Sequence, residues 1–334
     1  TRTTRTTRTT RTTRTTRTND RMKQSSIFSF VSSGGLPPKT RVVDLFCGIG
    51  GFSCGAKQAG HEVVLAVDSN RDLLKCHVDN NPTCQHVQCE LPAKLPLPTS
   101  GKWHLHGSPP CTKLSIMQPI QPEDEREHAV DLVVWFLNLA MTSGATSWTM
   151  EQVAHKAVIS QMEELKRKHP LKADWMSVDA VNYEVPQRRR RVIAGSPFLI
   201  ANIRFFKSKK RRLTVRDVLP NPPREFLRNS LYTRPDPNTG ESVDVPLKDK
   251  LRSVDKASFT ILATGHLKWA DADGIVLRHL KGAEKALIQT FPKEYKLPKS
   301  KMDSLVGVGN AVPPRLAEIL MMPTHYALTL TGRE

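Results

Sequence analysis

A short loop about one third of the way along the chain presents a single thiol. Residues 107–115 read Gly-Ser-Pro-Pro-Cys-Thr-Lys-Leu-Ser, and the thiol belongs to Cys111. The two prolines restrict the backbone directly before the cysteine. A thiolate can act as a nucleophile in covalent catalysis, whereas a lone cysteine is more often a small buried core residue. The motifs around the loop favour the nucleophile.

Four further motifs accompany this loop. They are Asp-Leu-Phe-Cys-Gly-Ile-Gly-Gly-Phe-Ser at 44–53, Met-Glu-Gln-Val at 150–153, Gln-Arg-Arg-Arg-Arg at 187–191 and Gly-Val-Gly-Asn-Ala-Val at 307–312. Each motif is a weak signal by itself. In this order and spacing, the five together resemble the DNA cytosine-5 methyltransferase family. The resemblance runs from about residue 41 to residue 320, nearly the whole chain after its N-terminal tail.

The resemblance implies a way to methylate C5 of cytosine, which is a poor nucleophile. The thiolate of Cys111 would add to C6, and C5 would then attack a methyl sulfonium. The carboxyl group of Glu151 would stabilise the ring near N3 by hydrogen bonding or proton donation. Arg189 and Arg191 would hold the cytosine O2 and nearby phosphates, although four consecutive arginines can also be a solvated surface run. The target base would first have to swing out of the duplex.

The segment before the loop predicts the first unit of a doubly wound α/β sheet. A buried strand at 41–46 is followed by glycines, a helix at 52–59 and a strand at 62–67 that ends at Asp68. Asp68 lies 20 residues after Gly48, the distance at which an acid binds ribose hydroxyls. The glycine spacing differs from the pyrophosphate fingerprint, which favours S-adenosylmethionine over NAD.

The resemblance also implies the residues that contact this cofactor. They are Phe46, Gly48, Gly50, Gly51, Asp68, Glu90, Pro109, Asn310 and Ala311. Three positions depart from the family pattern. Gln152 stands where Asn is usual, Thr112 stands where many relatives have Gln, and Glu90 is a substitute for the acid expected near residue 89. Because the amide of Gln152 is one methylene longer than that of Asn, the hydrogen bonding of its loop could differ.

We therefore expect an α/β fold with a Rossmann-like class I methyltransferase sheet. Beyond the first unit, the pattern predicts helices at 126–140, 153–168, 282–291 and 315–321, and strands at 145–150, 175–181 and 191–194. The strand at 145–150 should deliver Glu151 at its carboxyl end, where ligands bind in such sheets. The last helix should pack beside the first strand.

Composition divides the chain into three parts. Residues 1–38 form a basic Thr/Arg tail and linker without an apolar face, which predicts disorder. Residues 39–197 and 256–330 form the catalytic methyltransferase domain. Residues 198–255 are basic and interrupted by prolines, and they form a short, loop-rich target-recognition region inserted before the C-terminal motifs. The tail is either a phosphate-binding arm or a translated nucleotide repeat.

Charge and cysteine usage indicate the partner and the compartment. The formal net charge of +18 favours double-stranded DNA as the partner, with an anionic membrane surface as the rival. No apolar run reaches the ~18 residues of a membrane span, so we expect a soluble protein. We also expect it to be a monomer. Six scattered cysteines indicate a reducing intracellular compartment, nuclear if the host is eukaryotic. The spacing of Cys76, Cys84, His86 and Cys89 matches no common zinc pattern, so we expect no metal site.

Two other functions remain open from the sequence. One branch of the family acts on RNA, and the short recognition region keeps a tRNA cytosine-5 methyltransferase of the same fold possible. A DNA-binding relative without activity is the second alternative. The presence of Cys111, Glu151 and Arg191 argues against it.

Overall fold

The computed structural model describes residues 39–110, 123–206, 212–230, 233–235 and 242–322. Three predictions fall outside these residues. They concern the nucleophile Cys111, its neighbour Thr112 and the tail at 1–38.

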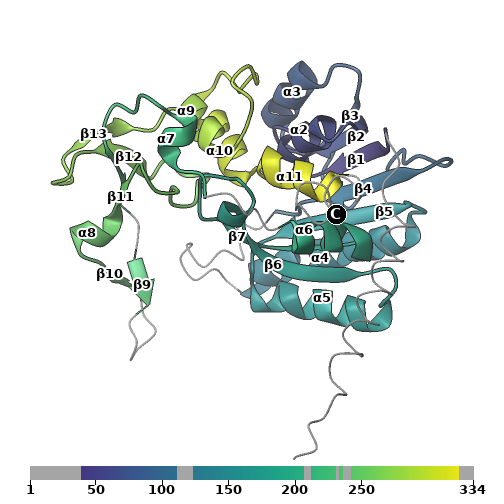
Figure 1. Ribbon diagram of the computed structural model, residues 1–334. Helices are drawn as coiled ribbons and strands as arrows, with labels where there is room; N and C mark the ends of the chain where they lie inside the picture. Colours follow the sequence, from purple (N-terminus) through teal and green to yellow (C-terminus); the bar gives the residue numbers. More distant parts are fainter. Residues whose placement is uncertain (1–38, 111–122, 207–211, 231–232, 236–241, 323–334) are drawn as a thin grey trace, which may run out of the picture.

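A large sheet forms the centre of the described chain (Figure 1). Its seven strands are β1 (Arg41–Leu45), β2 (Glu62–Asp68), β3 (Gln85–Gln88), β4 (Trp103–Gly107), β5 (Ser147–Gln152), β6 (Asp174–Asp179) and β7 (Arg190–Gly195). Their spatial order is β3-β2-β1-β4-β5-β7-β6. All neighbours from β3 to β5 pair in parallel, and β7 runs antiparallel to both β5 and β6. The predicted α/β class with a mostly parallel sheet is confirmed.

The strand order reverses beside β1. This strand pairs in parallel with β2 on one side and with β4 on the other. The crossovers after β1 and after β4 therefore diverge, which leaves a crevice at the carboxyl ends of these strands. The strand order therefore indicates, independently of any motif, that a ligand would bind at the edge formed by the carboxyl ends of these strands.

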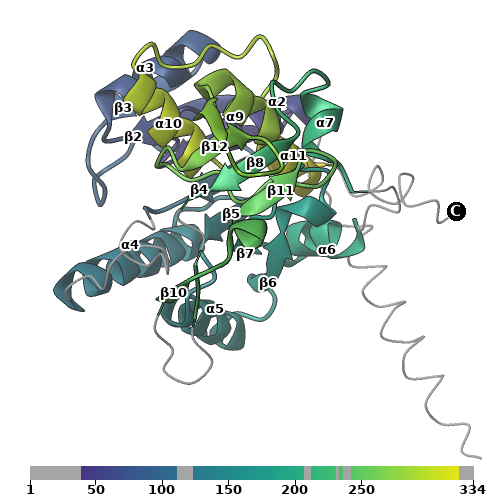
Figure 2. The same cartoon turned by 90° about the vertical axis from the view of Figure 1, so that its left-hand side faces the viewer.

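Helices cover both faces of the large sheet. One face carries α2 (Gly51–Gln58), α6 (Pro197–Phe205) and α11 (Pro314–Met321), and the other carries α4 (Glu123–Thr142) and α5 (Lys156–Lys168). In Figure 2, α4 and α5 lie below α2 and α11. Buried Phe52, Leu199 and Leu316 belong to the core of the first face, and Phe136 and Met162 to that of the second. The last helix packs against α2 in the core that also contains Val42 of β1.

A second, smaller unit lies to one side of the large sheet (Figure 1). Its antiparallel sheet has the order β11-β8-β12-β13, with bounds Leu251–Ser253, Phe226–Asn229, Leu267–Ala270 and Val276–His279. The short elements around it are β9 (Thr233–Pro235), β10 (Ser242–Asp244), α7 (Val215–Val218), α8 (Leu247–Lys250) and α9 (Gly282–Ile288). Its core around Leu227 and Trp269 continues through Val308 of α10 (Lys301–Asn310) to Leu73 of α3 (Arg71–Asn80). The two units therefore share buried contacts.

Most predicted element boundaries differ from the structure by one to three residues, and two of these differences bear on the site. Strand β5 runs through Gln152, so Glu151 lies inside the strand and not just beyond its end. The helix predicted at 153–168 begins only at Lys156, because the imidazole of His155 accepts the backbone N–H of Ala157 at 3.3 Å and caps the helix there.

The predicted recognition region at 198–255 and the small sheet overlap without coinciding. Helix α6, at the start of that region, packs in the core of the large sheet. Strands β12 and β13 follow its predicted end, yet they pair with β8 and with each other. Side-chain packing and strand pairing, which composition does not show, define the small unit.

Candidate active site

The predicted site residues come from neighbouring strands that end at one edge of the large sheet. Phe46 follows β1, Asp68 ends β2, and Pro109 follows β4. Glu151 lies near the end of β5. Because these strands are parallel, their carboxyl ends meet at the same edge. The order of the strands thus assembles residues that are more than one hundred positions apart.

Residues 46–51, which we call the cofactor turn, have an unusual backbone. Phe46, Gly48 and Gly50 adopt φ values of 57°, 53° and 91°. This left-handed region is open to glycine, but it is strained for a phenylalanine. Gly51 is needed for a different reason, because a Cβ there would lie 2.2 Å from the carbonyl oxygen of Val312. The turn therefore depends on backbone conformation at 48 and 50 and on close packing at 51.

The carboxylate of Asp68 is oriented toward the cofactor turn. Its Oδ2 accepts the backbone N–H of Gly48 at 2.7 Å, and its Oδ1 accepts that of Asn70 at 2.8 Å. Burial raises the pKa of this carboxyl group. Each oxygen keeps a further acceptor position. The carboxylate is therefore fixed in place and can still accept hydrogen bonds from the hydroxyl groups of a ligand.

The other predicted cofactor residues surround the same edge. Pro109 is buried, and Phe46 packs edge-on against Trp135 with ring centroids 6.2 Å apart. Glu90 is exposed just after β3. Asn310 is exposed at the end of α10.

Ala311 is the last predicted cofactor residue, and it follows α10. A Cβ built on Gly51 would lie 3.0 Å from the Cβ of Ala311. This contact brings the C-terminal motif beside the cofactor turn. The predicted residues of the two motifs are therefore adjacent in the fold.

Glu151 and Arg191 form a buried ion pair. The Nε of Arg191 lies 3.1 Å from Oε1 of Glu151, and both side chains are largely removed from solvent. Arg191 also donates to the carbonyl of Arg190 at 2.7 Å. Glu151 therefore has a cationic neighbour in a largely buried setting.

Arg189 has a different environment from Arg191. Its side chain is only 2 % exposed, and its Nη1 donates to the carbonyls of Gly309 at 3.0 Å and Ile261 at 3.3 Å. Its Nε lies 3.8 Å from Oε1 of Glu151. This guanidinium joins three distant segments of the chain. It therefore positions the backbone around the acid.

A family model described as C-5 cytosine-specific DNA methylase matches residues 40–140 and 148–323. The chain belongs to this family. Its activity is that of a DNA cytosine-5 methyltransferase. Type II methyltransferase M.HgiDI of Herpetosiphon aurantiacus is 30% identical over 298 residues, covering 84% of this chain and 92% of that protein. Type II methyltransferase M.HindV of Haemophilus influenzae is 26% identical over 314 residues, with 84% and 94% covered.

Solved structures show the same fold. A prophage-encoded E. coli protein assigned as a DNA modification methyltransferase superposes with a TM-score of 0.57 at 18% identity, covering 89% of this chain and all of that one. The S. pombe Dnmt2 methyltransferase gives a TM-score of 0.55 at 16% identity, with 87% and 99% covered. At these identities the likeness supports the Rossmann-like methyltransferase fold and nothing finer.

Gln152 of this methylase, the departure from the usual Asn, links β5 to the loop that carries Cys111. Its Nε2 donates to the carbonyl oxygen of Pro109 at 3.0 Å, and its Oε1 accepts the backbone N–H of Val153 at 2.7 Å. The longer amide therefore makes two hydrogen bonds at the site. One of them reaches Pro109, two positions before Cys111 in the sequence.

Sequence reasoning missed two glutamines that organise the site. Gln187 donates to Gln289, and its own Oε1 accepts the backbone N–H of Ile261 at 2.8 Å. Gln289 in turn donates to the carbonyls of Val308 at 3.0 Å and Ala311 at 2.9 Å. Gln187 belongs to the Gln-Arg-Arg-Arg-Arg motif, so the sequence offered a reason to expect a role for it. Gln289 follows an ordinary apolar helix, and no feature of the sequence pointed to it.

A buried polar network under the cofactor turn was also missed. Ser53 donates to Asp44 at 2.6 Å and lies 2.9 Å from the imidazole of His77. Burial raises the pKa of Asp44 to about 7. The hydroxyl of Tyr295 donates to the carbonyl of Ile49 in the turn. These hydrogen bonds connect the backbone of the cofactor turn and the start of α2 to buried polar side chains.

No helix in the described part of the chain is long and apolar enough to cross a membrane. Within 39–322, apart from the gaps in the description, no group of three or more His, Cys, Asp or Glu side chains could hold a metal ion.

Proposed function

We propose that the protein transfers the methyl group of S-adenosylmethionine to C5 of cytosine in double-stranded DNA, through a covalent bond between Cys111 and C6 of an extruded base. One observation carries this proposal. Glu151 on β5 forms a buried ion pair with Arg191 on β7, and Gln152, the next residue of β5, is hydrogen-bonded to Pro109, two positions before Cys111. The acid and the segment that leads to the nucleophile are therefore joined directly.

The residues would act in sequence on the base. The thiolate of Cys111 adds to C6, and the electron pair of the C5–C6 double bond becomes available at C5. The carboxyl group of Glu151, in its protonated form, donates a hydrogen bond to N3, where negative charge develops. Once C5 carries the methyl group, transfer of its proton to water restores the C5–C6 double bond, and the C6–S bond breaks to release the thiolate of Cys111. We assign the contact with cytosine O2 to Arg191, because Arg189 is bonded to two backbone carbonyls.

The edge described above suits S-adenosylmethionine, which supplies an electrophilic methyl group when bound. The cofactor turn brings backbone close to a ligand, and the fixed carboxylate of Asp68 offers acceptors for ribose hydroxyls. Phe46 and Trp135 form an aromatic contact beside them. We propose that Pro109, Asn310 and Ala311 line the methyl-donor side. Glu90 is a candidate for the adenine amino group.

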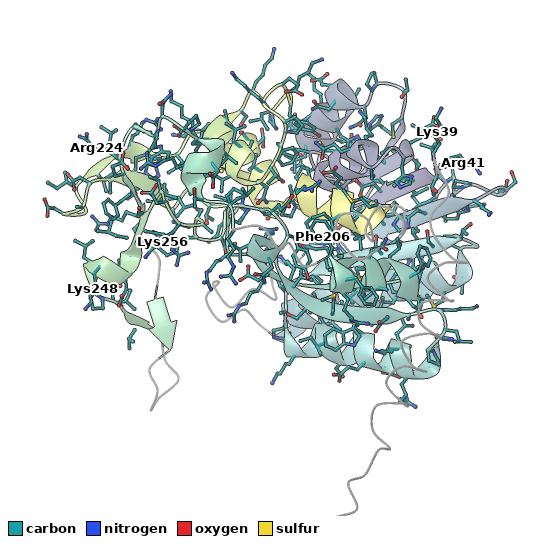
Figure 3. The ribbon with its side chains drawn as sticks, viewed as in Figure 1. Lys39, Arg41, Phe206, Arg224, Lys248 and Lys256 are labelled. Atoms are coloured by element: carbon teal, nitrogen blue, oxygen red, sulfur yellow. The ribbon has the colours of Figure 1, made fainter. Side chains whose placement is uncertain are left out.

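We propose that the small unit positions DNA. Exposed Arg224, Lys248 and Lys256 lie on this unit in Figure 3, at a distance from the large sheet. Exposed cations of this kind bind phosphates and orient a duplex without reading its sequence. Because the unit supplies few side chains for base readout, we expect a short or degenerate target site.

The working environment follows from the substrate. A protein that methylates DNA must act where DNA is, so we expect the reducing intracellular compartment, and the nucleus if the host is eukaryotic. We expect it to act as a monomer, which sedimentation of the protein with and without duplex would check.

A direct assay separates the candidate functions. Purified protein is incubated with labelled S-adenosylmethionine and separate DNA and RNA pools, and methylated cytosines are then mapped. Label in C5 of DNA cytosine supports the proposal. Label only in RNA would show the tRNA-type activity, and duplex binding without label would show an inactive relative.

A further inference from the structure

Lys285, in α9 of the small unit, is buried to 1 % exposure although its side chain ends in an ammonium group. In the described part of the chain, Nζ of Lys285 has neither a hydrogen-bond acceptor nor an ion-pair partner. Charges in protein interiors are normally paired, because removing an ammonium group from water is costly. This lysine therefore lacks the partner that its burial demands.

Lys285 lines a narrow pocket between α9 and the small sheet. The lining residues are Asn229, Thr260, Leu262, Thr264, His266, Leu267 and Lys285. None of these described residues carries a carboxylate. The hydroxyl of exposed Thr264 and the ring of half-buried His266 can act as donors beside the ammonium group. Because the space is too narrow to admit a whole ligand, an anion would approach Nζ with one oxygen atom from the mouth of the pocket.

The charges around this pocket are of one sign. Burial, and then the charge of Lys301, lower the pKa of Lys285 to about 8. Burial and the charge of Lys285 likewise lower the pKa of His266. The nearest acid along α9, Glu284, is already paired with Arg278 at 2.7 Å. An anion in the pocket would relieve this repulsion.

The pocket adjoins the catalytic residues. The hydroxyl of Thr260 donates to the carbonyl of Arg188 at 2.6 Å, and the backbone of Ile261 is bound by Gln187 and Arg189. The loop that forms one side of the pocket is thus tied to the segment that carries Arg191.

We propose that the pocket binds one phosphate of the DNA backbone next to the target cytosine, through Nζ of Lys285 with the donors of Thr264 and His266. The choice of DNA as the source of the phosphate rests on the function proposed above. The positive pocket itself rests only on the burial, lining and charges of these residues.

The main test compares Lys285→Met with Lys168→Met. Lys168 lies on α5, which covers the large sheet, so its substitution removes the same charge away from the pocket. Lys285→Met should weaken duplex binding about tenfold and lower the slope of log affinity against log salt by about one. Lys168→Met should change neither. Wild-type affinity and slope in Lys285→Met would overturn the proposal.

Thermal unfolding shows whether Lys285→Met changes the stability of the fold itself. Methionine of similar length replaces an unpaired buried charge, so Lys285→Met should melt at or above the wild-type temperature without DNA. A lower melting temperature would mean that Lys285 serves the fold, and it would count against the proposal.

A pH series on both proteins adds an independent measurement. Lys285 loses its proton as pH rises through its lowered pKa, so the affinity advantage of wild type over Lys285→Met should shrink between about pH 7 and about pH 9.5. The other charged or titratable groups nearby are Lys301, His266, Lys268 and His279. Because both proteins contain them, the ratio of affinities cancels their common effect. A ratio independent of pH would contradict the proposal.

Titration with inorganic phosphate shows whether the pocket binds a free anion or a phosphate of DNA. If phosphate raises the melting temperature of wild type but not of Lys285→Met, while both bind duplex equally, the pocket takes a free anion and the assignment to DNA is wrong. None of these arms requires methyl transfer. A wild-type protein that binds duplex without methylating it would therefore refute the proposed function and still decide the role of Lys285.

Discussion

The cofactor turn and the catalytic residues are held in two different ways. Asp68 binds the turn within a single strand-turn-helix-strand unit, 20 residues from Gly48. Arg189 instead bonds to carbonyls 72 and 120 residues away, and Gln187 to a glutamine 102 residues away. The first region is local and made largely of backbone. The second exists only when distant segments have already packed, so its side chains should couple activity to stability.

Cys111→Ser should have the largest effect. It should abolish methyl transfer and leave duplex binding largely intact, because an alcohol is a far weaker nucleophile than a thiolate. Initial rates with labelled S-adenosylmethionine, together with duplex affinity, check this. Near-normal turnover of the Ser variant would remove Cys111 from the mechanism.

The variants Arg189→Met and Arg191→Met should distinguish a residue that positions the backbone from a residue that acts on the substrate. Arg189→Met should lower the free energy of unfolding by about 2–6 kcal/mol, because it leaves the buried carbonyls of Ile261 and Gly309 without their donor, at about 1–3 kcal/mol each. Arg191→Met should lower kcat by on the order of 100-fold through loss of substrate stabilisation, with a smaller loss of stability. Denaturant unfolding and steady-state kinetics measure both quantities. Equal effects of the two variants would erase the distinction between them.

Asp68→Ala tests the local region. It should weaken S-adenosylmethionine binding by about 1–3 kcal/mol, the scale for polar groups left unpaired, and it should affect duplex affinity much less. Calorimetry with the cofactor alone gives the answer. Unchanged cofactor affinity would contradict the ribose contact.

Gln152→Asn should have the smallest effect. The shorter amide restores the residue usual in the family, and we expect a change in kcat of no more than about tenfold, the worth of one hydrogen bond. Gln152→Ala is the matched control, because it removes the donor to Pro109 altogether. If both variants keep wild-type kcat, the link between β5 and the Pro109 loop has no role in catalysis.

The sequence predicted the local parts of the site well. The strand-turn-helix unit at 41–68 could be read because its glycines, apolar runs and acid follow one another directly. The same reasoning placed Glu151 near the end of β5. It could not distinguish the roles of Arg189 and Arg191, because both belong to one run of arginines. Only the structure shows that Arg189 bonds to backbone carbonyls, whereas Arg191 pairs with Glu151.

The boundaries of the small unit also depend on long-range contacts that local sequence patterns do not show. Basic and proline-rich composition marked a region at 198–255, yet α6 joins the large core and β12 and β13 extend the small sheet. Composition describes one residue at a time. Strand pairing and burial are relations between residues, and no local pattern contains them.

The sequence by itself determined the family, the mostly parallel sheet and the residue types available for methyl transfer, because these follow from short motifs and hydrophobic periodicity. Only the tertiary structure decided which arginine meets Glu151, which glutamines hold the motifs together, and that Lys285 is buried without a partner among the described residues. The physical reason is that charge pairing and burial depend on what surrounds a side chain. For these residues, the surroundings come from segments far away in the chain.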